Sequence, residues 1–498
     1  MNLFMSAKAT KITNTYILTL GLRYNVSDEK AIGKYFELSR KLYNAILGQT
    51  LKRLKLMGES KLYQNARKEA NKKLKQDMFK DAEIEYGFRE YDISKFATGL
   101  MINEYKKLGS HIKAKLVNRA FDTANKMRFG KSKRVNFIRY GEMFSIEGAD
   151  NRQAIKYREG LIIFNKLKMP IIVRNNDEYA QRALEDRIKY CRFIKKIIRG
   201  KVKYYVQLVL EGTPPTKVNK ETGEVKVTLG EGNCGIDHGT QTSAISSKYQ
   251  VSLVELVPEI NNIHNKIVTI QRKLDRSRRT LNPNKYNENG TIIKGNRDKW
   301  IKSNRYIKLQ NELRELNRLQ VEIRTISHNK LVNKWLVLGD EFYVENMNYA
   351  GLQKRSKNTT INAKTGKYNS KKRFGKSLAN KAPSMFLEIL NRKLHYFGKE
   401  LHKINTYTVK ASQYNHFTDE YNKKKLSERW NTFNTDNKDI KIQRDLYSAF
   451  LIMNVNDEMN KVNREKCNKT YDNFKQLHDK EIERISNSNN KKISSMGL

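Results

Sequence analysis

Two short apolar segments that each end in a carboxylate place the strongest constraint on what this chain can fold into. Residues 234–240 read CGIDHGT and residues 342–348 read FYVENMN, with the acids Asp237 and Glu345 after the apolar residues. Short apolar runs bounded by glycine and polar residues are typical of buried strands. A third acid, Asp445, opens an apolar helical pattern whose small residues, one turn later, suit packing against a sheet. The pattern predicts an α/β domain with three acids at the ends of its elements.

Acids at the ends of neighbouring strands and of a helix can converge on one point, which makes a metal site the chemistry to consider. Mg²⁺ prefers hard oxygen ligands and keeps several waters, so a few carboxylates and a substrate phosphate suffice to bind it. Two such ions about 4 Å apart favour phosphodiester hydrolysis. We therefore expect Asp237, Glu345 and Asp445 to be both the catalytic residues and the ligands of two Mg²⁺ ions, with Mn²⁺ as a substitute. Taken singly, each motif is more often a turn or a helix cap.

The charge of the chain indicates a polyanionic partner. The 498 residues include 98 Lys and Arg against 52 Asp and Glu, a net charge of +46. Such a chain repels itself unless phosphates neutralise its surface, and a nucleic acid is the simplest source of phosphates. No apolar run long enough to cross a membrane and no signal peptide is recognisable. The three cysteines lack CxxC spacing, so we expect a cytoplasmic bacterial protein, associated with the nucleoid when bound to DNA.

The first half of the chain reads as a strand, a helical insertion and further strands. Residues 12–22 alternate like a strand, 27–128 show helical spacing, and 93–116 read as a second amphipathic helical stretch. Later strands include a hairpin of 188–197 and 202–210 around Gly200. This order predicts a small β-barrel interrupted by a helical domain. The expected segments are the start of the barrel at 1–26, the helical domain at 27–143, the remainder of the barrel at 144–215 and a linker at 216–230.

The second half predicts short strands that alternate with long helices. Strands are expected at 235–247, 250–257 and 342–345, and the patterns at 258–280 and 300–338 predict a helical hairpin. Residues 377–404 read as helical, and from Asn456 the polar, mixed-charge sequence predicts a loosely ordered tail. The expected segments are a nuclease domain at 231–410, an insertion at 411–440, the third acidic motif at 441–455 and the tail at 456–498.

Five motifs in the second half together resemble the TnpB family of transposon-associated, RNA-guided nucleases, from which compact type V CRISPR-Cas effectors descend. They are GIDHGT, FYVENMN, KSLANKAPSMFLEILNRKLHYFGKEL, KASQ and QRDLYSAF. The resemblance implies a multidomain α/β protein: a split β-barrel wedge domain with a helical recognition insertion, then an RNase H-like RuvC nuclease domain with a helical-hairpin insertion. It also implies an RNA-guided DNA endonuclease that binds a guide RNA and double-stranded target DNA. The RuvC acids carried over are Asp237, Glu345 and Asp445.

One departure from the family lies between the second and third RuvC motifs, where a zinc ribbon with two CxxC pairs is usual. Here Ala411-Ser412-Gln413 is followed by Tyr414-Asn415-His416-Phe417-Thr418, with Asn415 and Thr418 at the expected cysteine positions. We therefore expect no structural zinc in the insertion. Packing or nucleic-acid contacts must hold it instead, and His416 is more readily a packed residue than a ligand.

Three groups of basic residues are the candidate nucleic-acid contacts. They lie in a loop of the first half, at the end of the first hairpin helix and after the second acidic motif: Lys131, Lys133, Arg134, Arg272, Lys273, Arg276, Arg278, Arg279, Lys354, Arg355, Lys357, Lys371, Lys372 and Arg373.

Several alternatives stay open at the level of sequence. The chain is compatible with a CRISPR effector or with a transposon TnpB, and with a monomer or a self-associating dimer. A guide-independent resolvase or transposase of the same fold is a further alternative. An RNA-guided DNA-binding repressor without cleavage is another, although the intact acids argue against it.

Overall fold

The computed structural model describes residues 14–219, 221–363, 365–366, 368–369, 371–372, 374–423, 425, 428–435, 438–488 and 496–497. The chain divides into two compact units, Met1–Pro215 and Thr216–Leu498. Both units are mixtures of helices and strands, as the sequence predicts.

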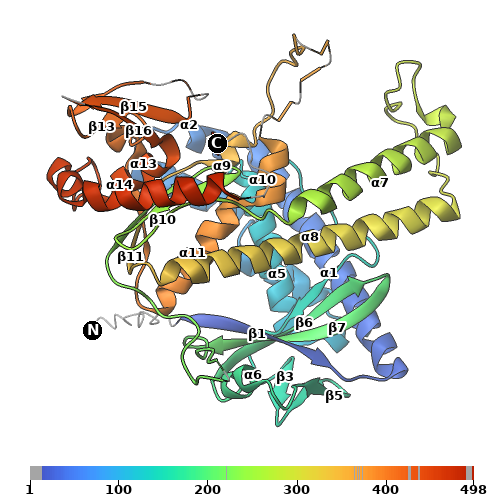
Figure 1. Cartoon of the computed structure of the whole chain (residues 1–498). Helices are drawn as coiled ribbons and strands as arrows, with labels where there is room; N and C mark the ends of the chain where they lie inside the picture. Colours follow the sequence, from blue (N-terminus) through green and yellow to red (C-terminus); the bar gives the residue numbers. More distant parts are fainter. Residues whose placement is uncertain are drawn as a thin grey trace, which may run out of the picture. The chain divides into compact units, whose positions relative to one another are not determined.

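Unit one is built on a curled antiparallel sheet of seven strands in the order β2-β6-β7-β1-β5-β4-β3 (Figure 1). In β1, Tyr16, Leu18 and Leu20 are buried while the residues between them are exposed, which is the alternation expected of a sheet with one covered face. The strands are β1 (Thr15–Leu22), β2 (Ser145–Glu147), β3 (Lys156–Arg158), β4 (Leu161–Phe164), β5 (Leu167–Ile172), β6 (Ile188–Ile198) and β7 (Lys201–Glu211).

The predicted hairpin around Gly200 is confirmed. Ile198 pairs with Lys201 across a two-residue turn, and Arg199 and Gly200 both have positive φ, of 50° and 79°. Two successive left-handed residues define the turn that matches the natural twist of a hairpin, and glycine adopts the second of them without strain.

The helices of unit one follow β1, as the predicted insertion requires, with one short helix later. They are α1 (Val26–Glu59), α2 (Lys61–Lys68), α3 (Lys72–Glu85), α4 (Glu90–Gly99), the 3-10 helix η1 (Asn103–Leu108), α5 (Gly109–Arg128) and α6 (Glu178–Ala183). The stretch predicted to be helical over 93–116 consists of α4, η1 and the start of α5, with breaks between them. Asn103 and Gly109 have φ of 47° and 73°, and neither value fits within an α-helix.

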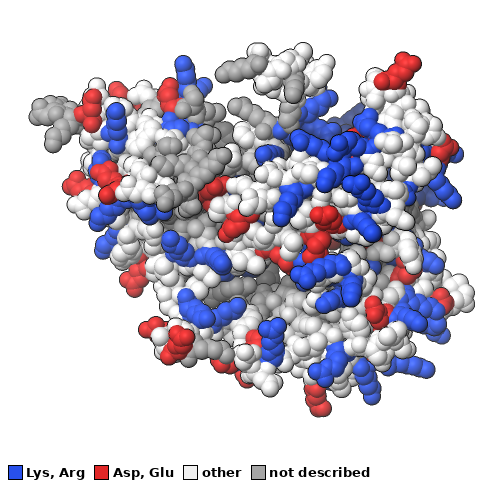
Figure 2. Space-filling model, turned by 45° about the vertical axis from the view of Figure 1, so that its right-hand side comes forward, with Lys and Arg blue, Asp and Glu red and all other residues white. Residues whose placement is uncertain are grey.

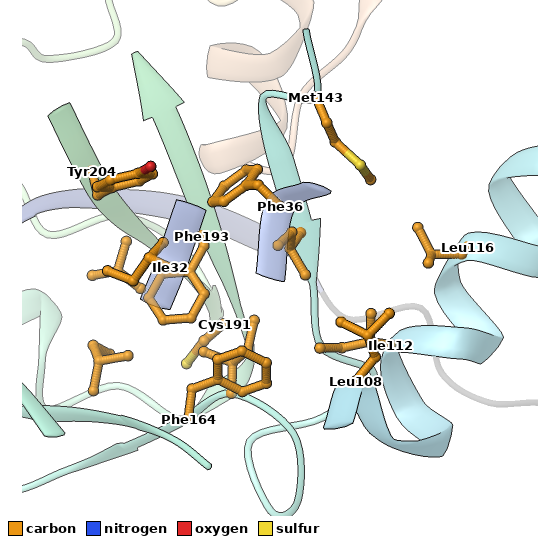
Figure 3. Close-up of a cluster of buried hydrophobic side chains, with 14 of the residues drawn as sticks. Ile32, Phe36, Leu108, Ile112, Leu116, Met143, Phe164, Cys191, Phe193 and Tyr204 are labelled. Carbon is orange, nitrogen blue, oxygen red and sulfur yellow. The ribbon is translucent and has the colours of Figure 1, made fainter. Parts of the chain in front are cut away.

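The core of unit one joins α1 and α5 to the sheet. Figure 3 shows Ile32 and Phe36 of α1 close to Phe193 and Tyr204 of the sheet, and each of these side chains is at most 5% exposed. Phe36 and Tyr204 lie 5.6 Å apart between ring centroids. The helical insertion is therefore anchored on the sheet through its first and last long helices.

Unit two contains a five-stranded mixed sheet in the order β10-β9-β8-β11-β12. Strands β8, β9 and β10 are antiparallel neighbours, whereas β8, β11 and β12 run parallel. The strands are β8 (Asn233–His238), β9 (Thr242–Ser246), β10 (Val251–Glu255), β11 (Glu341–Glu345) and β12 (Leu401–Ile404). The predicted strands at both acidic motifs are confirmed.

Helices cover both faces of this sheet. One face packs on the ends of α8 and α11 through Cys234, Ile236 and Phe342, and the other packs on α13 and α14 through Ala244 and Leu253. The helices are α7 (Ile260–Leu281), the 3-10 helix η2 (Pro283–Lys285), α8 (Asn304–Leu336), α9 (Tyr349–Leu352), α10 (Gly375–Lys381), α11 (Pro383–Tyr396), α12 (Thr406–Val409), α13 (Arg444–Met453) and α14 (Arg464–Ser486). Helices α7 and α8 pack together as the predicted hairpin.

Two predictions for the second half, a continuous helix over 377–404 and a loosely ordered tail from Asn456, differ from the structure. Residues 377–404 are not continuously helical: Ala382 adopts a left-handed φ of 45° before Pro383, and the segment ends in strand β12. The expected loose tail contains helix α14, whose Cys467, Phe474 and Ile485 are buried on one face. Their spacing repeats at multiples of the helical turn, which the polar composition of the segment conceals.

Two small two-stranded sheets complete the described residues of unit two. They are β13 (Tyr414–Asn415) with β14 (Glu420–Tyr421), and β15 (Trp430–Thr435) with β16 (Lys438–Gln443). Within the described residues, no helix has the length and apolar character needed to cross a membrane.

Candidate active site

The parallel pairing of β8 and β11 brings the first two predicted acids side by side. Val344 pairs with Ile236, so Asp237 and Glu345 follow at equivalent positions on adjacent strands. Ile236 and Val344 belong to the core on the α8 and α11 face. Because side chains alternate along a strand, both acids project from the opposite face, where α13 packs.

The third acid reaches the same place because α13 lies unusually close to β8. A Cβ on Gly235 would stand 2.1 Å from the carbonyl oxygen of Ala449 and 2.2 Å from the amide nitrogen of Met453. Only glycine allows this contact between strand and helix backbones. Asp445 lies in the first turn of α13, is 9% exposed, and benefits from the positive end of the helix dipole.

The three carboxylates influence one another electrostatically. The pKa of Asp237 is raised well above its usual value, first by burial and then by the charges of Asp445 and Glu345, with Arg444 and Arg429 acting in the opposite direction. Burial also raises the pKa of Glu345. Like charges that converge in a desolvated place are unfavourable unless a cation joins them.

Two arginines that the sequence analysis did not single out balance the charge of Asp445. The Arg444 guanidinium donates to Asp445 Oδ1 from Nε at 3.3 Å and from Nη2 at 3.2 Å. Arg429 Nη1 lies 3.9 Å from Asp445 Oδ2. Arg444 directly precedes the acid, so its position was a usable signal, whereas Arg429 comes from the segment before β15 and nothing local marks it.

Two more residues next to the acids have structural partners. Tyr349 is buried and donates from its hydroxyl to the carbonyl oxygen of His238 at 2.7 Å. Burial, together with the charges of Asp237 and Glu345, raises its pKa. The His238 ring contacts Ser243 Oγ at 2.8 Å and the carbonyl oxygen of Pro383 at 3.0 Å. Burial lowers the pKa of His238 to about 4, so this imidazole is neutral.

The acids suit a hard cation by chemistry, although they are not arranged here as a finished ligand set. No three Asp, Glu, His or Cys side chains among the described residues are grouped so that they could hold a metal ion. Repulsion from Asp445 and Glu345 contributes to the raised pKa of Asp237, after the larger effect of burial. A divalent cation would relieve that repulsion, so Asp237, Glu345 and Asp445 are the residues that would hold it.

The cysteine-free insertion is fastened to α13 by an aromatic cluster. His416 is 1% exposed, its Nδ1 lies 2.6 Å from the Tyr447 hydroxyl, and its backbone amide donates to the same oxygen at 3.1 Å. Its ring also packs on Phe417, Phe450 and Tyr471. His416 is thus a packed residue, as predicted.

The predicted nucleic-acid contacts fall into different environments. Figure 2 shows Lys and Arg side chains gathered over the region where Figure 1 has α7 and α8. On α7, Arg272, Lys273 and Arg276 are exposed. Arg278 and Arg279 instead pair with Asp275 at 2.6 and 2.9 Å.

The other predicted contacts lie in loops. These residues are exposed: Lys131, Lys133, Arg134, Lys354, Arg355, Lys357, Lys371 and Lys372. Arg373 lies outside the described residues. The arginines that act on the pKa of Asp237 are Arg444 and Arg429, and neither belongs to the predicted nucleic-acid contacts.

Comparison with known structures returns chains from CRISPR complexes. One, titled "Cryo-EM structure of the Cas12f1-sgRNA-target DNA complex", is 10% identical, with a TM-score of 0.46 over 88% of this chain and 98% of that chain. Another, titled "Cryo-EM structure of CRISPR-Cas12f Ternary Complex", is 13% identical, with a TM-score of 0.25 over 86% and 82%. No protein-family model matches the sequence, and no curated protein matches it significantly. With TM-scores below 0.5, these similarities do not by themselves define the chemistry of the site.

Proposed function

We propose that this protein is an RNA-guided DNA endonuclease that hydrolyses complementary double-stranded DNA at Asp237, Glu345 and Asp445. Two observations support the proposal: the parallel register of β8 and β11 sets Asp237 and Glu345 side by side, and the pKa of Asp237 is raised by burial and then by the charges of Asp445 and Glu345. Buried carboxylates whose pKa is raised by burial and by neighbouring charges are typical of functional sites.

In this mechanism the chain's residues hold and orient the reacting groups. The three carboxylates would hold Mg²⁺, or Mn²⁺ in its place, and two such ions would supply Lewis-acid chemistry for attack of water on a phosphodiester. Arg429 and Arg444 offset the negative charge of Asp445. One site cuts the two strands in turn.

The proposed guide is an RNA, for two reasons. The net charge of +46 suits a large bound polyanion, and the motifs of the second half resemble those of RNA-guided nucleases. Base pairing then reads the target sequence, while the protein contacts backbone and shape. In this proposal, the sheet of unit one is the wedge domain, its helices are the recognition insertion, and unit two is the RuvC nuclease.

The first test identifies the RNA. The protein is expressed together with its native flanking DNA, purified, and any RNA that accompanies it is sequenced. We expect a discrete small RNA with a constant scaffold and a separate guide segment. A guide encoded in a repeat array would indicate a CRISPR effector, and a guide from a transposon end would indicate a TnpB protein. Heterogeneous fragments would refute RNA guidance.

The second test addresses cleavage. The purified RNA complex is incubated with Mg²⁺ and a DNA duplex that matches the guide, beside a mismatched duplex. Asp237→Ala and Glu345→Gln should abolish cutting while RNA binding persists. Glu341→Gln is the matched control, because Glu341 lies on the same strand but pairs with Lys399 at 2.6 Å.

The outcomes separate the alternatives. Target binding without cutting by the wild type would favour an RNA-guided repressor. Cutting that does not depend on RNA would favour a resolvase or transposase. Undiminished cutting by Asp237→Ala would refute the assignment of the site.

A further inference from the structure

Unit one contains a cleft of about 740 Å³ that is separate from the three acids. It is lined by the end of α1, by α2, by the end of α5 and by the loop that follows α5. Its volume lies within the range of pockets that bind small organic ligands, roughly 300–1,000 Å³. A nucleotide is a ligand of this size.

The lining combines an apolar wall with a cationic rim. Leu51, Leu54 and Met127 provide apolar surface, and the ring of Tyr63 lies among them. The rim is formed by exposed cations that line the cleft: Lys55, Arg67, Lys133 and Arg134. No acidic residue lines the cleft among the described residues. Arg67, Lys133 and Arg134 form no ion pair with any residue that the structure describes, so these charges are available to an anion.

A rigidly held arginine also lines the same cleft. The Arg128 side chain is only 9% exposed, and its Nη1 lies 2.7 Å from Glu83. Its guanidinium carbon lies within 6 Å of the centroids of four aromatic rings, among them Tyr63 at 5.8 Å and Phe129 at 5.2 Å. Its buried Nε has no hydrogen-bond partner among the described residues. An unpaired buried donor is unfavourable, and a hydrogen-bond acceptor that enters the cleft would relieve that cost.

We propose that this cleft binds one unpaired nucleotide of a nucleic-acid strand. The base lies against the apolar wall and the Tyr63 ring, and its flanking phosphates contact Arg67, Lys133 and Arg134. Aromatic stacking beside a positive groove is the usual means of binding single strands. A base that is paired and stacked within a duplex cannot enter such a cleft. The inference rests on the proposed function, because a bound guide or an opened target supplies the unpaired nucleotide.

The test uses photocrosslinking, which reports position as well as affinity. The full-length protein is mixed with short single strands that carry one 5-iodouracil, in RNA and in DNA form, and with a duplex of the same length. After irradiation, crosslinked peptides are identified by mass spectrometry. We expect a crosslink in α2 or at the end of α5 with single strands and none there with the duplex. The RNA and DNA forms show which strand supplies the nucleotide.

Variants test whether binding of the single strand depends on the cleft itself or only on the overall positive charge of the surface. Tyr63→Ala should lower the crosslink yield about tenfold, whereas Tyr63→Phe keeps the ring and the crosslink. Arg67→Ala alters an exposed side chain, so the fold persists, and it should weaken single-strand binding and reduce the salt slope by about one. Lys126→Ala removes one charge from exposed surface of α5 outside the cleft and should leave the affinity within about twofold.

A cleavage reaction run with the same preparation separates the two proposals. If the protein cuts its target but crosslinks form only elsewhere, or equally with the duplex, the cleft proposal is refuted and the proposed function stands. If the protein neither retains RNA nor cuts DNA, and no crosslink forms in the cleft, both proposals fall.

Discussion

Adding one methyl group to Gly235 should disrupt both the packing of unit two and the site. A Cβ at this position would lie 2.1 Å from Ala449 O and 2.2 Å from Met453 N, and real Cβ contacts essentially never fall below 3.0 Å. Backbone atoms cannot rotate away, so α13 must retreat from β8 by about 1 Å. Overpacking of this kind destabilises a protein by about 3 kcal/mol. For a domain the size of unit two, this lowers the unfolding midpoint by roughly 5–10 °C.

The same displacement carries Asp445 away from Asp237 and Glu345. Misplacement of a catalytic group by about 1 Å can slow a reaction about 100-fold. The assay therefore measures thermal unfolding and cleavage for Gly235→Ala beside Gly99→Ala. A Cβ on Gly99, the last residue of α4, meets no atom within 4 Å. The control should be neutral or slightly stabilising, because alanine favours a helix.

Two results would contradict the reasoning. If Gly235→Ala unfolds at the wild-type temperature and cuts at the wild-type rate, the close contact of α13 with β8 does not exist in solution. If the variant is destabilised but cuts normally at a temperature where it is folded, the contact does not position Asp445.

Three further predictions address the charges and the insertion. Asp237→Asn should abolish cleavage yet raise the unfolding midpoint at pH 8. The raised pKa of Asp237 means that its ionised form destabilises the fold, so the gain should shrink as the pH falls through that pKa and the wild-type carboxyl becomes neutral. A zinc-selective chelator should leave the unfolding midpoint unchanged, and a large fall in that midpoint would contradict the idea that aromatic packing holds the insertion. EDTA should stop cleavage, and added Mg²⁺ should restore it. Glu481→Ala should lower the free energy of unfolding, measured in urea, by about 2 kcal/mol. The buried Glu481 carboxylate accepts hydrogen bonds from Ser252 Oγ at 3.1 Å and from Leu253 N at 2.7 Å. An unchanged unfolding midpoint would refute the stabilising role of these bonds.

The strands that carry Asp237 and Glu345 could be predicted because their signal is local. Each is a short apolar run with an acid at its end, and parallel strands place their carboxyl ends at one edge of a sheet. The role of Gly235 could not be predicted in the same way. Its tight contact is with the backbone of α13 at Ala449 and Met453. That contact depends on α13, more than 200 residues later in the chain.

The elements that the sequence analysis described wrongly show where composition misleads. Helix α14 is polar overall, yet Cys467, Phe474 and Ile485 on one of its faces are buried in the core of unit two. The break between α4 and α5 depends on the positive φ of Asn103. Asparagine adopts this conformation at modest cost, and the spacing of apolar residues gives no sign of it.

The described part of the insertion between β12 and α13 is held by side-chain packing around His416. Thiolate ligands would fix such a small segment through a few strong bonds, whereas here many weak contacts converge on His416. Tyr447, two residues after Asp445, receives the His416 amide and contacts its ring nitrogen. Arg464 donates to the carbonyl oxygens of His416 and Phe417 at 2.8 and 2.6 Å, which ties the same turn to the start of α14. The same insertion carries Arg429, whose Nη1 lies 3.9 Å from Asp445 Oδ2, so the packing around His416 helps to keep both charges of that pair in place.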